Sequence, residues 1–317
     1  MEFSREEHRY TPVETLRSTQ NAVMLKVTYS SMASPKSEVP LQVLVVNTHK
    51  FDCVYELMKE YALARRCVHK NLVAPHVSFT AAGVDRPGNL WVVMPLVSRV
   101  SLRSMMMMSS EFRNGLPEPV VAFVLREILE GLDCIHRVGG GGNVHGNVCA
   151  GCIYMDEETT TVKLAFRSLT CEEVTGPWRE CKTEPGNSLP PYATAADIWS
   201  FGLLILELLF GEIPVETHNG LQEFINNDVI IVPKSSGKYV YRMKPLCGRN
   251  PGGSGGGGDA ERLSGPLGEI IKECLRKDPK KRPTAQQLLE HDYFKLSKGK
   301  GKDVKKVLVR LQKHTVS

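Results

Sequence analysis

Hydrophobic residues recur along this chain with two different periods, and each period predicts a different element. From Glu118 to His136, apolar residues fall at positions 121, 124, 125, 128, 132 and 135, which predicts a long amphipathic helix with one buried stripe. Residues 51–67 also have helical spacing, whereas the β-branched run at 41–47 and the run at 90–96 predict strands. Strands therefore gather in the first third of the chain, and a long helix follows them.

Length and composition are compatible with two lobes of unequal size. The chain has 317 residues, of which 42% are hydrophobic and 24% are charged, as in ordinary globular proteins. Neither the first residues, MEFSREEH, nor any later segment has the apolar run of a leader or a membrane span. Nine cysteines without a regular framework are typical of reduced thiols. We therefore expect a cytoplasmic protein, with the nucleus left open.

Residues 144–153, VHGNVCAGCI, resemble the catalytic loop of protein kinases without its catalytic groups. That loop reads H-R-D-x-x-x-x-N, where the Asp accepts the proton of the substrate hydroxyl and the Asn holds Mg²⁺. His145 matches, but Gly146 takes the Arg position, Asn147 the Asp position and Cys152 the Asn position. An amide does not accept a proton near pH 7, and sulfur is a poor ligand for Mg²⁺. We therefore expect no catalytic residue here.

The neighbouring segments make the resemblance more specific. LREILEGLDCIH and VKLAF flank the loop, and all three resemble the Sterile-20-related germinal-centre kinases, in particular the Fray-like, oxidative-stress-responsive branch. The loop of that branch reads IHRDVKAGNI, so Cys149 replaces its phosphate-contacting lysine. In VKLAF the Asp of the family's L-x-D-F-G segment is either replaced by Phe166 or deleted, depending on register. The run Gly139–Gly142 has no counterpart in the family, and we expect it to loosen the turn.

The second half of the chain resembles the large lobe of these kinases. Residues 192–214 are similar to helix F, and residues 274–294 are similar to the end of the lobe. The resemblance implies structural roles for Asp197, which would hold the backbone of the loop, and for Arg282, whose usual A-P-E glutamate is not recognisable. It also implies a bilobal α+β protein-kinase-like fold with a small β-rich lobe and a larger, mainly helical lobe. The expected parts are an extension at 1–9, an N-lobe at 10–95, a C-lobe at 96–296 with a flexible Gly-rich insert at 250–259, and a basic tail at 297–317.

The positions that line an ATP site in the family have changed type. The family's Gly-rich loop falls within residues 10–27, and its glycine positions are taken by Arg17, Thr19 and Asn21. An ordinary hairpin is the alternative for this segment. The lysine that should hold the phosphates is Val46 or Asn47, depending on the register of the strand. We therefore expect neither ATP nor any other cofactor to bind.

Two further positions follow from the same resemblance. Met94 would be the gatekeeper at the end of the last small-lobe strand, and Glu60 would be the helix-C glutamate. Because its lysine partner is missing, we expect Glu60 to be solvated or paired with Lys59 or Arg65.

Three classes of function remain. The favoured class is a catalytically inactive kinase-like protein, a pseudokinase, that acts as an allosteric partner or scaffold in serine/threonine kinase signalling. Its partner would be an active Sterile-20-like kinase or that kinase's scaffold. The alternative is a weakly active or ATP-binding serine/threonine kinase in which Lys50, Glu157 or Lys163 has been redeployed. The third is a thiol or metal site at Cys149 and Cys152, although a single C-x-x-C is a weak zinc signal. We expect no bound metal and no role for these two thiols.

Charge adds little to this assignment. The net charge of +5 favours neither a nucleic acid nor a membrane as partner. In the basic tail, Val304, Val307, Leu308 and Leu311 share one helical face. The tail could therefore contact an acidic surface or an anionic lipid, or pack back on its own domain.

Overall fold

The structure, a computed structural model, describes residues 2–30, 38–48, 51–81, 88–156, 159–170, 193–211, 230–233, 239–242, 265–296 and 301–313. Three features considered above lie outside the described residues: Lys50, Glu157 and the Gly-rich insert 250–259. The stretch 171–192 that follows VKLAF also lies outside them.

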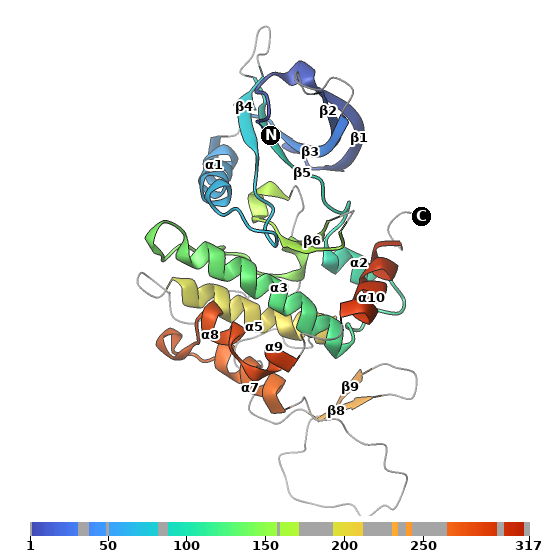
Figure 1. The fold of residues 1–317 in the computed structure, drawn as a ribbon, viewed down its shortest axis with the longest axis vertical. Helices are drawn as coiled ribbons and strands as arrows, with labels where there is room; N and C mark the ends of the chain where they lie inside the picture. Colours follow the sequence, from blue (N-terminus) through green and yellow to red (C-terminus); the bar gives the residue numbers. More distant parts are fainter. Residues whose placement is uncertain are drawn as a thin grey trace, which may run out of the picture.

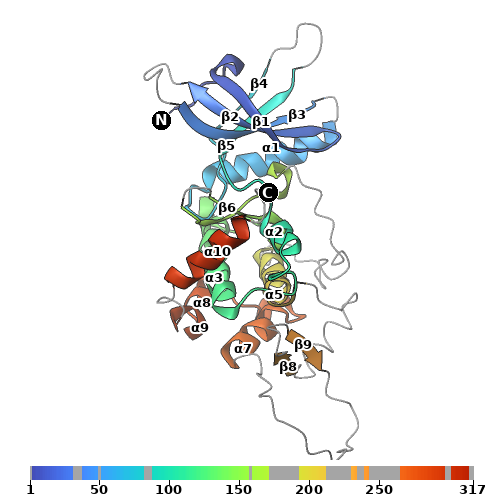
Figure 2. The same ribbon diagram turned by 90° about the vertical axis from the view of Figure 1, so that its right-hand side faces the viewer.

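The N-terminal lobe is a five-stranded antiparallel sheet with one helix against it (Figures 1 and 2). The strand order is β1-β2-β3-β5-β4. A short 3₁₀ turn, Glu7–Arg9, leads into the first strand. The elements are β1 (Tyr10–Ser18), β2 (Ala22–Ser30), β3 (Glu38–Val46), α1 (Phe51–Arg66), β4 (Val77–Thr80) and β5 (Leu90–Pro95).

The two faces of this sheet bury different sets of side chains. Because successive residues of a strand point to opposite faces, Val43 packs in an outer cluster with Val27 and Trp91. Leu44 and Val46 pack on the inner face with Leu57 of α1 and with residues of the second lobe. The inner face of the small lobe and the core of the large lobe therefore form one continuous hydrophobic cluster.

The C-terminal lobe is built on two helices that lie side by side, α3 and α5 (Figure 1). The six apolar positions predicted to form one stripe of α3 are all buried, which confirms that prediction. Helix α5 is buried on all sides from Phe201 to its end. Gly202 permits close packing with α7, because a Cβ there would lie 2.9 Å from the Cβ of Cys274, the last residue of that helix. The elements are α2 (Leu102–Met108), α3 (Glu118–Arg137), α5 (Thr194–Phe210), α7 (Gly265–Cys274), α8 (Ala285–Leu289) and α9 (Asp292–Leu296).

Two small hairpins complete the described part of this lobe. Strands β6 (Ile153–Met155) and β7 (Val162–Leu164) pair directly after the 144–153 loop. Strands β8 (Ile230–Pro233) and β9 (Tyr239–Arg242) form a second pair. The first hairpin connects the loop to the VKLAF segment and so fixes the distance between them.

The basic tail contains a helix, α10 (Gly301–Lys313), that packs back on the large lobe. Its apolar face, Val304, Leu308 and Leu311, is buried against α2 and α3. Arg310 forms an ion pair with Glu111 at 3.3 Å. Of the two arrangements considered for the tail, the described part adopts packing on its own domain.

The bilobal α+β, protein-kinase-like fold expected from the sequence is the one observed. Within the described part of the chain, no helix is both long and apolar enough to cross a membrane.

Candidate functional site

Asp197 of α5 holds the backbone at the start of the 144–153 loop. Its Oδ2 accepts from the His145 N–H at 2.7 Å, and its Oδ1 accepts from the Gly146 N–H at 2.8 Å. His136, at the end of α3, contacts Oδ2 at 2.9 Å. Burial opposes ionisation of this carboxyl, but the contacts with His136 and His145 outweigh burial and lower the pKa of Asp197. One buried carboxylate therefore binds three groups, two of which are backbone N–H groups of the loop.

His145 joins the loop to the segment after β7. Its Nε2 lies 3.1 Å from the carbonyl oxygen of Ala165, and its ring lies 4.7 Å from the ring of Phe166. Burial lowers the pKa of His145, so the ring is neutral at physiological pH. The Ala165 N–H donates to Cys152 O at 2.9 Å.

This geometry bears on the missing Asp of the L-x-D-F-G segment. Phe166 packs in the core against His145, whereas Ala165 is the residue bonded to Cys152. Neither of these two side chains carries an oxygen or nitrogen atom that could bind Mg²⁺ in place of the Asp.

Three of the four changed positions of the loop are hydrogen-bonded through the side chain of Asn147. Asn147 Nδ2 donates to Cys152 Sγ at 3.3 Å, and the Cys149 thiol donates to Asn147 Oδ1 at 3.8 Å. The Asn147 N–H donates to His145 Nδ1 at 3.3 Å. The groups that replace the Asp, Lys and Asn of the kinase loop thus serve as each other's partners.

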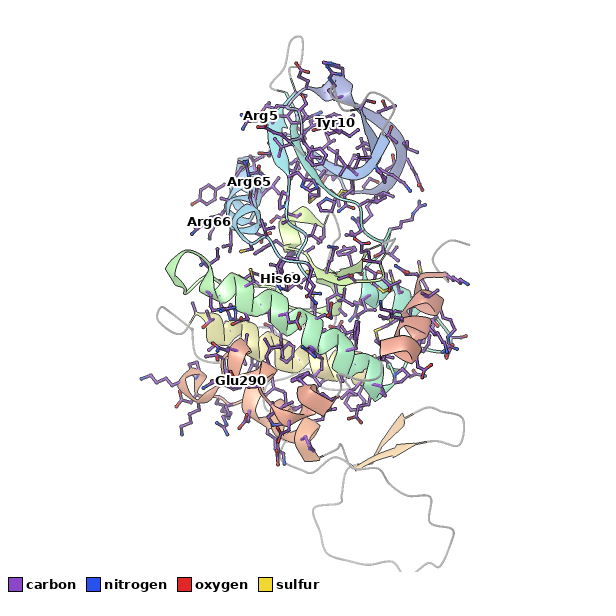
Figure 3. The ribbon with its side chains drawn as sticks, viewed as in Figure 1. Arg5, Tyr10, Arg65, Arg66, His69 and Glu290 are labelled. Carbon is purple, nitrogen blue, oxygen red and sulfur yellow. The ribbon has the colours of Figure 1, made fainter. Side chains whose placement is uncertain are left out.

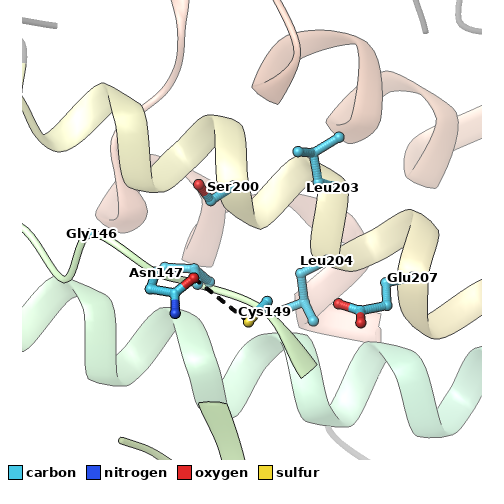
Figure 4. A pocket seen from close by; sticks show the side chains of 8 residues that line it. Gly146, Asn147, Cys149, Ser200, Leu203, Leu204 and Glu207 are labelled. Atoms are coloured by element: carbon cyan, nitrogen blue, oxygen red, sulfur yellow. Dashed lines mark hydrogen bonds between the residues drawn. The ribbon is translucent and has the colours of Figure 1, made fainter. Parts of the chain in front are cut away.

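Glu207 anchors the middle of the loop, a role that the sequence analysis missed. Its Oε2 accepts from the Ala150 N–H at 3.0 Å, and its Oε1 lies 2.5 Å from Arg103 Nη1 of α2. Beside it, a cavity of about 40 Å³ is lined by the loop and by α5 (Figure 4). The lining residues are Gly146, Asn147, Val148, Cys149, Ser200, Leu203, Leu204 and Glu207.

The segment expected to replace the Gly-rich loop is a tight hairpin between β1 and β2. Thr19 Oγ1 accepts from the N–H groups of Asn21 and Ala22, at 3.4 and 3.2 Å. The Thr19 N–H donates to Ala22 O at 2.8 Å. Two of the three glycine positions therefore form a closed turn.

Arg17, the remaining glycine position, lies over Tyr154 of β6. The guanidinium carbon is 4.8 Å from the centre of the Tyr154 ring, within the range of a cation–π contact. Arg17 Nη1 also donates to Arg99 O at 3.0 Å, just after β5. Sequence reasoning did not single out Tyr154, because nothing in its local pattern indicates a contact with β1.

Tyr154 and three residues of the small-lobe sheet have almost no exposed surface. Met24, Leu44, Met94 and Tyr154 are each between 0% and 1% exposed, and all four belong to the cluster that joins the lobes. The space between the lobes at these residues is therefore filled by side chains.

The inner face of β3 carries no lysine. Val46 is buried on this face, but Asn47 is exposed beyond the end of the strand, where its N–H donates to Asn21 O at 3.0 Å. Gln42 lies opposite Met94, and Leu44 lies between Gln42 and Val46 on the same face. Of the two registers considered, only Val46 is compatible with an inward position, and Leu44 is a further candidate.

Glu60 of α1 has a partner in the second lobe that the sequence did not indicate. It is half-buried, and its Oε2 accepts from the Ser168 N–H at 2.8 Å. Ser168 belongs to the 3₁₀ turn Arg167–Leu169 that follows Phe166. Arg65, which is labelled in Figure 3, donates to Tyr61 Oη at 3.3 Å. The backbone of a second-lobe segment thus holds Glu60, through a contact between residues 108 positions apart.

Arg282 has backbone carbonyls as partners. It donates to Arg276 O at 2.8 Å, to Ala195 O at 2.9 Å and to Lys277 O at 3.3 Å. Its guanidinium also lies over Trp199 at 5.0 Å. These contacts connect the start of α5 to the end of the lobe.

Lys163 is the one residue of the three considered for redeployment that the structure describes, and its partners lie outside the loop. Lys163 Nζ donates to Lys70 O at 2.9 Å and lies 3.9 Å from Asp156. Among the described residues, no group of three or more His, Cys, Asp or Glu side chains is placed to hold a metal ion.

Comparison with known proteins agrees with this architecture. Residues 188–294 match the family model described as Protein kinase domain. Serine/threonine-protein kinase fray2 of Dictyostelium discoideum is 27% identical over 285 residues, which cover 87% of this chain and 25% of the relative. Germinal center kinase 3 of Caenorhabditis elegans is 28% identical over 307 residues, which cover 89% of this chain and 46% of the relative.

A further relative is serine/threonine-protein kinase fray1 of Dictyostelium discoideum, which is 26% identical over 276 residues, or 83% of this chain and 42% of the relative. The chain thus spans between a quarter and just under half of the length of these curated relatives. It has a protein-kinase-like fold, and it is similar in sequence to serine/threonine kinases of the Fray and germinal-centre type.

Proposed function

We propose that this protein is a catalytically inactive, protein-kinase-like protein that acts as an allosteric partner or scaffold in serine/threonine kinase signalling. The observation that carries the proposal is the mutual hydrogen bonding of Asn147, Cys149 and Cys152. In an active kinase these positions turn outward to a substrate hydroxyl, a phosphate and Mg²⁺. Here they need no ligand, and none of the three can serve as the base or hold Mg²⁺.

The space between the lobes supports the same conclusion. Phosphoryl transfer depends on positioning the phosphates and neutralising their charge. The inner face of β3 offers Gln42, Leu44 and Val46 in place of a lysine, and Arg17 covers Tyr154. The described inner face of β3 therefore lacks the lysine that would hold the phosphates.

One observation favours the alternative that a nucleotide still binds without metal. The Gln42 side chain is 2% exposed, and its Oε1 has no hydrogen-bond partner among the described residues. An unpaired buried acceptor costs about 1–3 kcal/mol, and a ligand with an N–H donor would satisfy it once the side chains that cover this oxygen move aside. Titration with ATP in the presence and absence of Mg²⁺ separates this alternative from an active kinase, because only the latter requires the metal.

The partner is proposed to be an active Sterile-20-like kinase or its scaffold, bound at α1. Lys59 and Arg65 of this helix are exposed, and Tyr55 beside them is 62% exposed. A coupling of about 1–3 kcal/mol between this face and a partner changes the partner's equilibrium by about 5- to 150-fold. The chain can therefore act on a kinase without performing chemistry.

The test uses purified full-length protein and the kinases that co-purify with it. Reversing charge at Lys59→Glu with Arg65→Glu is expected to weaken capture and to abolish any effect on the activity of the captured kinase. The matched control is Lys277→Glu with Lys281→Glu, two exposed lysines of the other lobe, which should leave capture unchanged. If the wild-type protein captures neither a kinase nor a kinase scaffold, and alters the rate of none, the partner proposal fails.

A further inference from the structure

Cys149 and Cys152 lie at the two ends of a closed four-residue turn. The Cys152 N–H donates to Cys149 O at 2.9 Å, and Ala150–Cys152 form a 3₁₀ turn. A turn of this kind holds its first and fourth Cα atoms within about 7 Å of each other. A disulfide joins Cα atoms that are about 4.4–6.8 Å apart. The backbone here is therefore already close to the geometry that a disulfide needs.

Both sulfur atoms also approach the same side-chain amide. Cys152 Sγ accepts from Asn147 Nδ2 at 3.3 Å, and Cys149 Sγ donates to Asn147 Oδ1 at 3.8 Å. The dashed line in Figure 4 marks the contact between Asn147 and Cys149. The nitrogen and the oxygen of one amide group each contact one of the two sulfur atoms. The two thiols therefore lie on the same side of the turn.

Small molecules have space beside Cys149. The cavity shown in Figure 4 has a volume of about 40 Å³ and is lined by Cys149, Ser200 and Glu207, among others. One water needs roughly 10–15 Å³ by this measure, so a molecule the size of hydrogen peroxide fits. The cavity thus offers space for a small oxidant beside Cys149.

Three other described cysteines serve as an internal comparison. Burial raises the pKa of the Cys67 thiol to about 11, and it also raises the pKa values of Cys134 and Cys274. Thiols that stay protonated react slowly. Cys274, like Cys152, is 0% exposed, and Cys149 is 4% exposed, so Cys274 serves as a control that is matched for burial.

We propose that Cys149 and Cys152 form a reversible dithiol–disulfide pair that hydrogen peroxide oxidises through this cavity. This differs from the expectation, based on the sequence, that the two thiols have no role. The new observation is that they share one amide and one closed turn.

The reaction proceeds in two balanced steps. The Cys149 sulfur bonds to one oxygen of the peroxide and the O–O bond breaks. The released hydroxide takes up the thiol proton and leaves as one water. The Cys152 sulfur then displaces the hydroxyl of the resulting sulfenic acid, and a second water leaves. Two thiols are oxidised, and one peroxide is reduced to two waters. A small thiol reductant reverses the change by exchange.

The pair is independent of the proposed signalling function, because it uses neither a nucleotide nor a partner. Oxidation would remove both sulfur contacts from the Asn147 amide, and Asn147 is bonded to His145. The state of the thiols would thus alter the loop that Asp197 holds.

The experiment treats the folded full-length protein with a small excess of hydrogen peroxide, blocks free thiols with iodoacetamide and digests the protein with trypsin. The peptide 138–163 contains Cys149 and Cys152 and no other cysteine. The expected product is this peptide without alkylation and two hydrogen atoms lighter than its reduced form. Treatment with dithiothreitol after the peroxide and before the iodoacetamide should give the peptide with both cysteines alkylated. In Cys149→Ser, Cys152 should remain alkylatable after the same treatment, while Cys274→Ser should leave the product unchanged.

Three results would overturn the proposal. The first is that both thiols stay alkylatable at peroxide levels that oxidise the other cysteines. The second is that the peptide gains oxygen atoms without forming the internal disulfide. The third is that native protein contains one zinc ion per chain by elemental analysis, which would make the pair part of a metal site.

Discussion

Replacing Asp197 by asparagine should destabilise the protein much more than the same change at an exposed aspartate. Asp197 accepts from the N–H groups of His145 and Gly146 and contacts His136, and it is 1% exposed. Asparagine offers one acceptor oxygen, so at least one of these donors loses its partner, and the remaining bonds lose the charge. A buried donor without a partner costs about 1–3 kcal/mol, and a hydrogen bond to a charged group contributes about 1.5–3 kcal/mol.

We therefore expect Asp197→Asn to lower the free energy of unfolding by about 2–4 kcal/mol near pH 7. Urea unfolding followed by circular dichroism measures this quantity. The matched control is Asp303→Asn, which removes a carboxylate that is 89% exposed and paired only with Lys306 among the contacts described, and it should change stability by less than about 0.5 kcal/mol. If the two variants differ by less than about 0.5 kcal/mol, the assigned role of Asp197 is wrong.

The pKa of Asp197 determines how the stability difference between the wild type and Asp197→Asn depends on pH. Its folded-state pKa is lowered from the ordinary value of 3.8, so the ionised carboxylate stabilises the folded state. That contribution is fully present above the unfolded pKa and is lost as pH falls through the folded pKa. The difference between wild type and Asp197→Asn should therefore hold from pH 7 down to about pH 5 and shrink below 3.8.

Three further substitutions test separate contacts. Arg17→Ala removes the guanidinium from the Tyr154 ring and should cost about 0.5–2 kcal/mol in urea unfolding, with no gain of Mg²⁺-dependent ATP binding; such a gain would contradict the account. Glu60→Ala leaves the Ser168 N–H without its carboxylate acceptor, so hydrogen exchange at residues 167–170 should accelerate while exchange in α3 should not. Exchange at 167–170 as slow as in the wild type would count against the contact. Gly146 has φ +80° and nothing within 4 Å of an added Cβ, so Gly146→Ala should cost about 1–2 kcal/mol from backbone strain alone, and an unchanged free energy of unfolding would refute that strain.

Local patterns were enough to predict much of the fold. The apolar spacing in residues 118–136 marked one buried stripe, and α3 buries all of it. The same principle failed on β3, where both faces of the strand are buried and apolar residues alternate with other apolar residues. When a strand has no polar face, the alternation of its residues does not show which side points inward. Asn47 therefore remained a candidate for the lysine position until its exposure was known.

The contacts that define the candidate site could not be read from the sequence. Glu60 meets Ser168 and Arg17 meets Tyr154 only because the lobes pack together. The Gly139–Gly142 run was expected to loosen its turn, yet all four residues adopt positive φ, and the Gly142 N–H donates to His136 O at 3.0 Å. Glycine is needed there because other residues rarely adopt that conformation, so the run shapes the entry to the loop.

The central claim is that the site has lost the chemistry of phosphoryl transfer, and thermal unfolding with ATP and Mg²⁺ tests it most directly. A ligand at 100 times its Kd stabilises a folded protein by about 2.7 kcal/mol, which is readily seen as a higher Tm. The kinase domain of an active relative serves as the positive control, and ATP with a chelator replaces Mg²⁺ in a parallel titration. The account predicts that millimolar ATP with Mg²⁺ raises the Tm of the control and not that of this protein. A rise in the Tm of this protein that disappears when Mg²⁺ is chelated would contradict it.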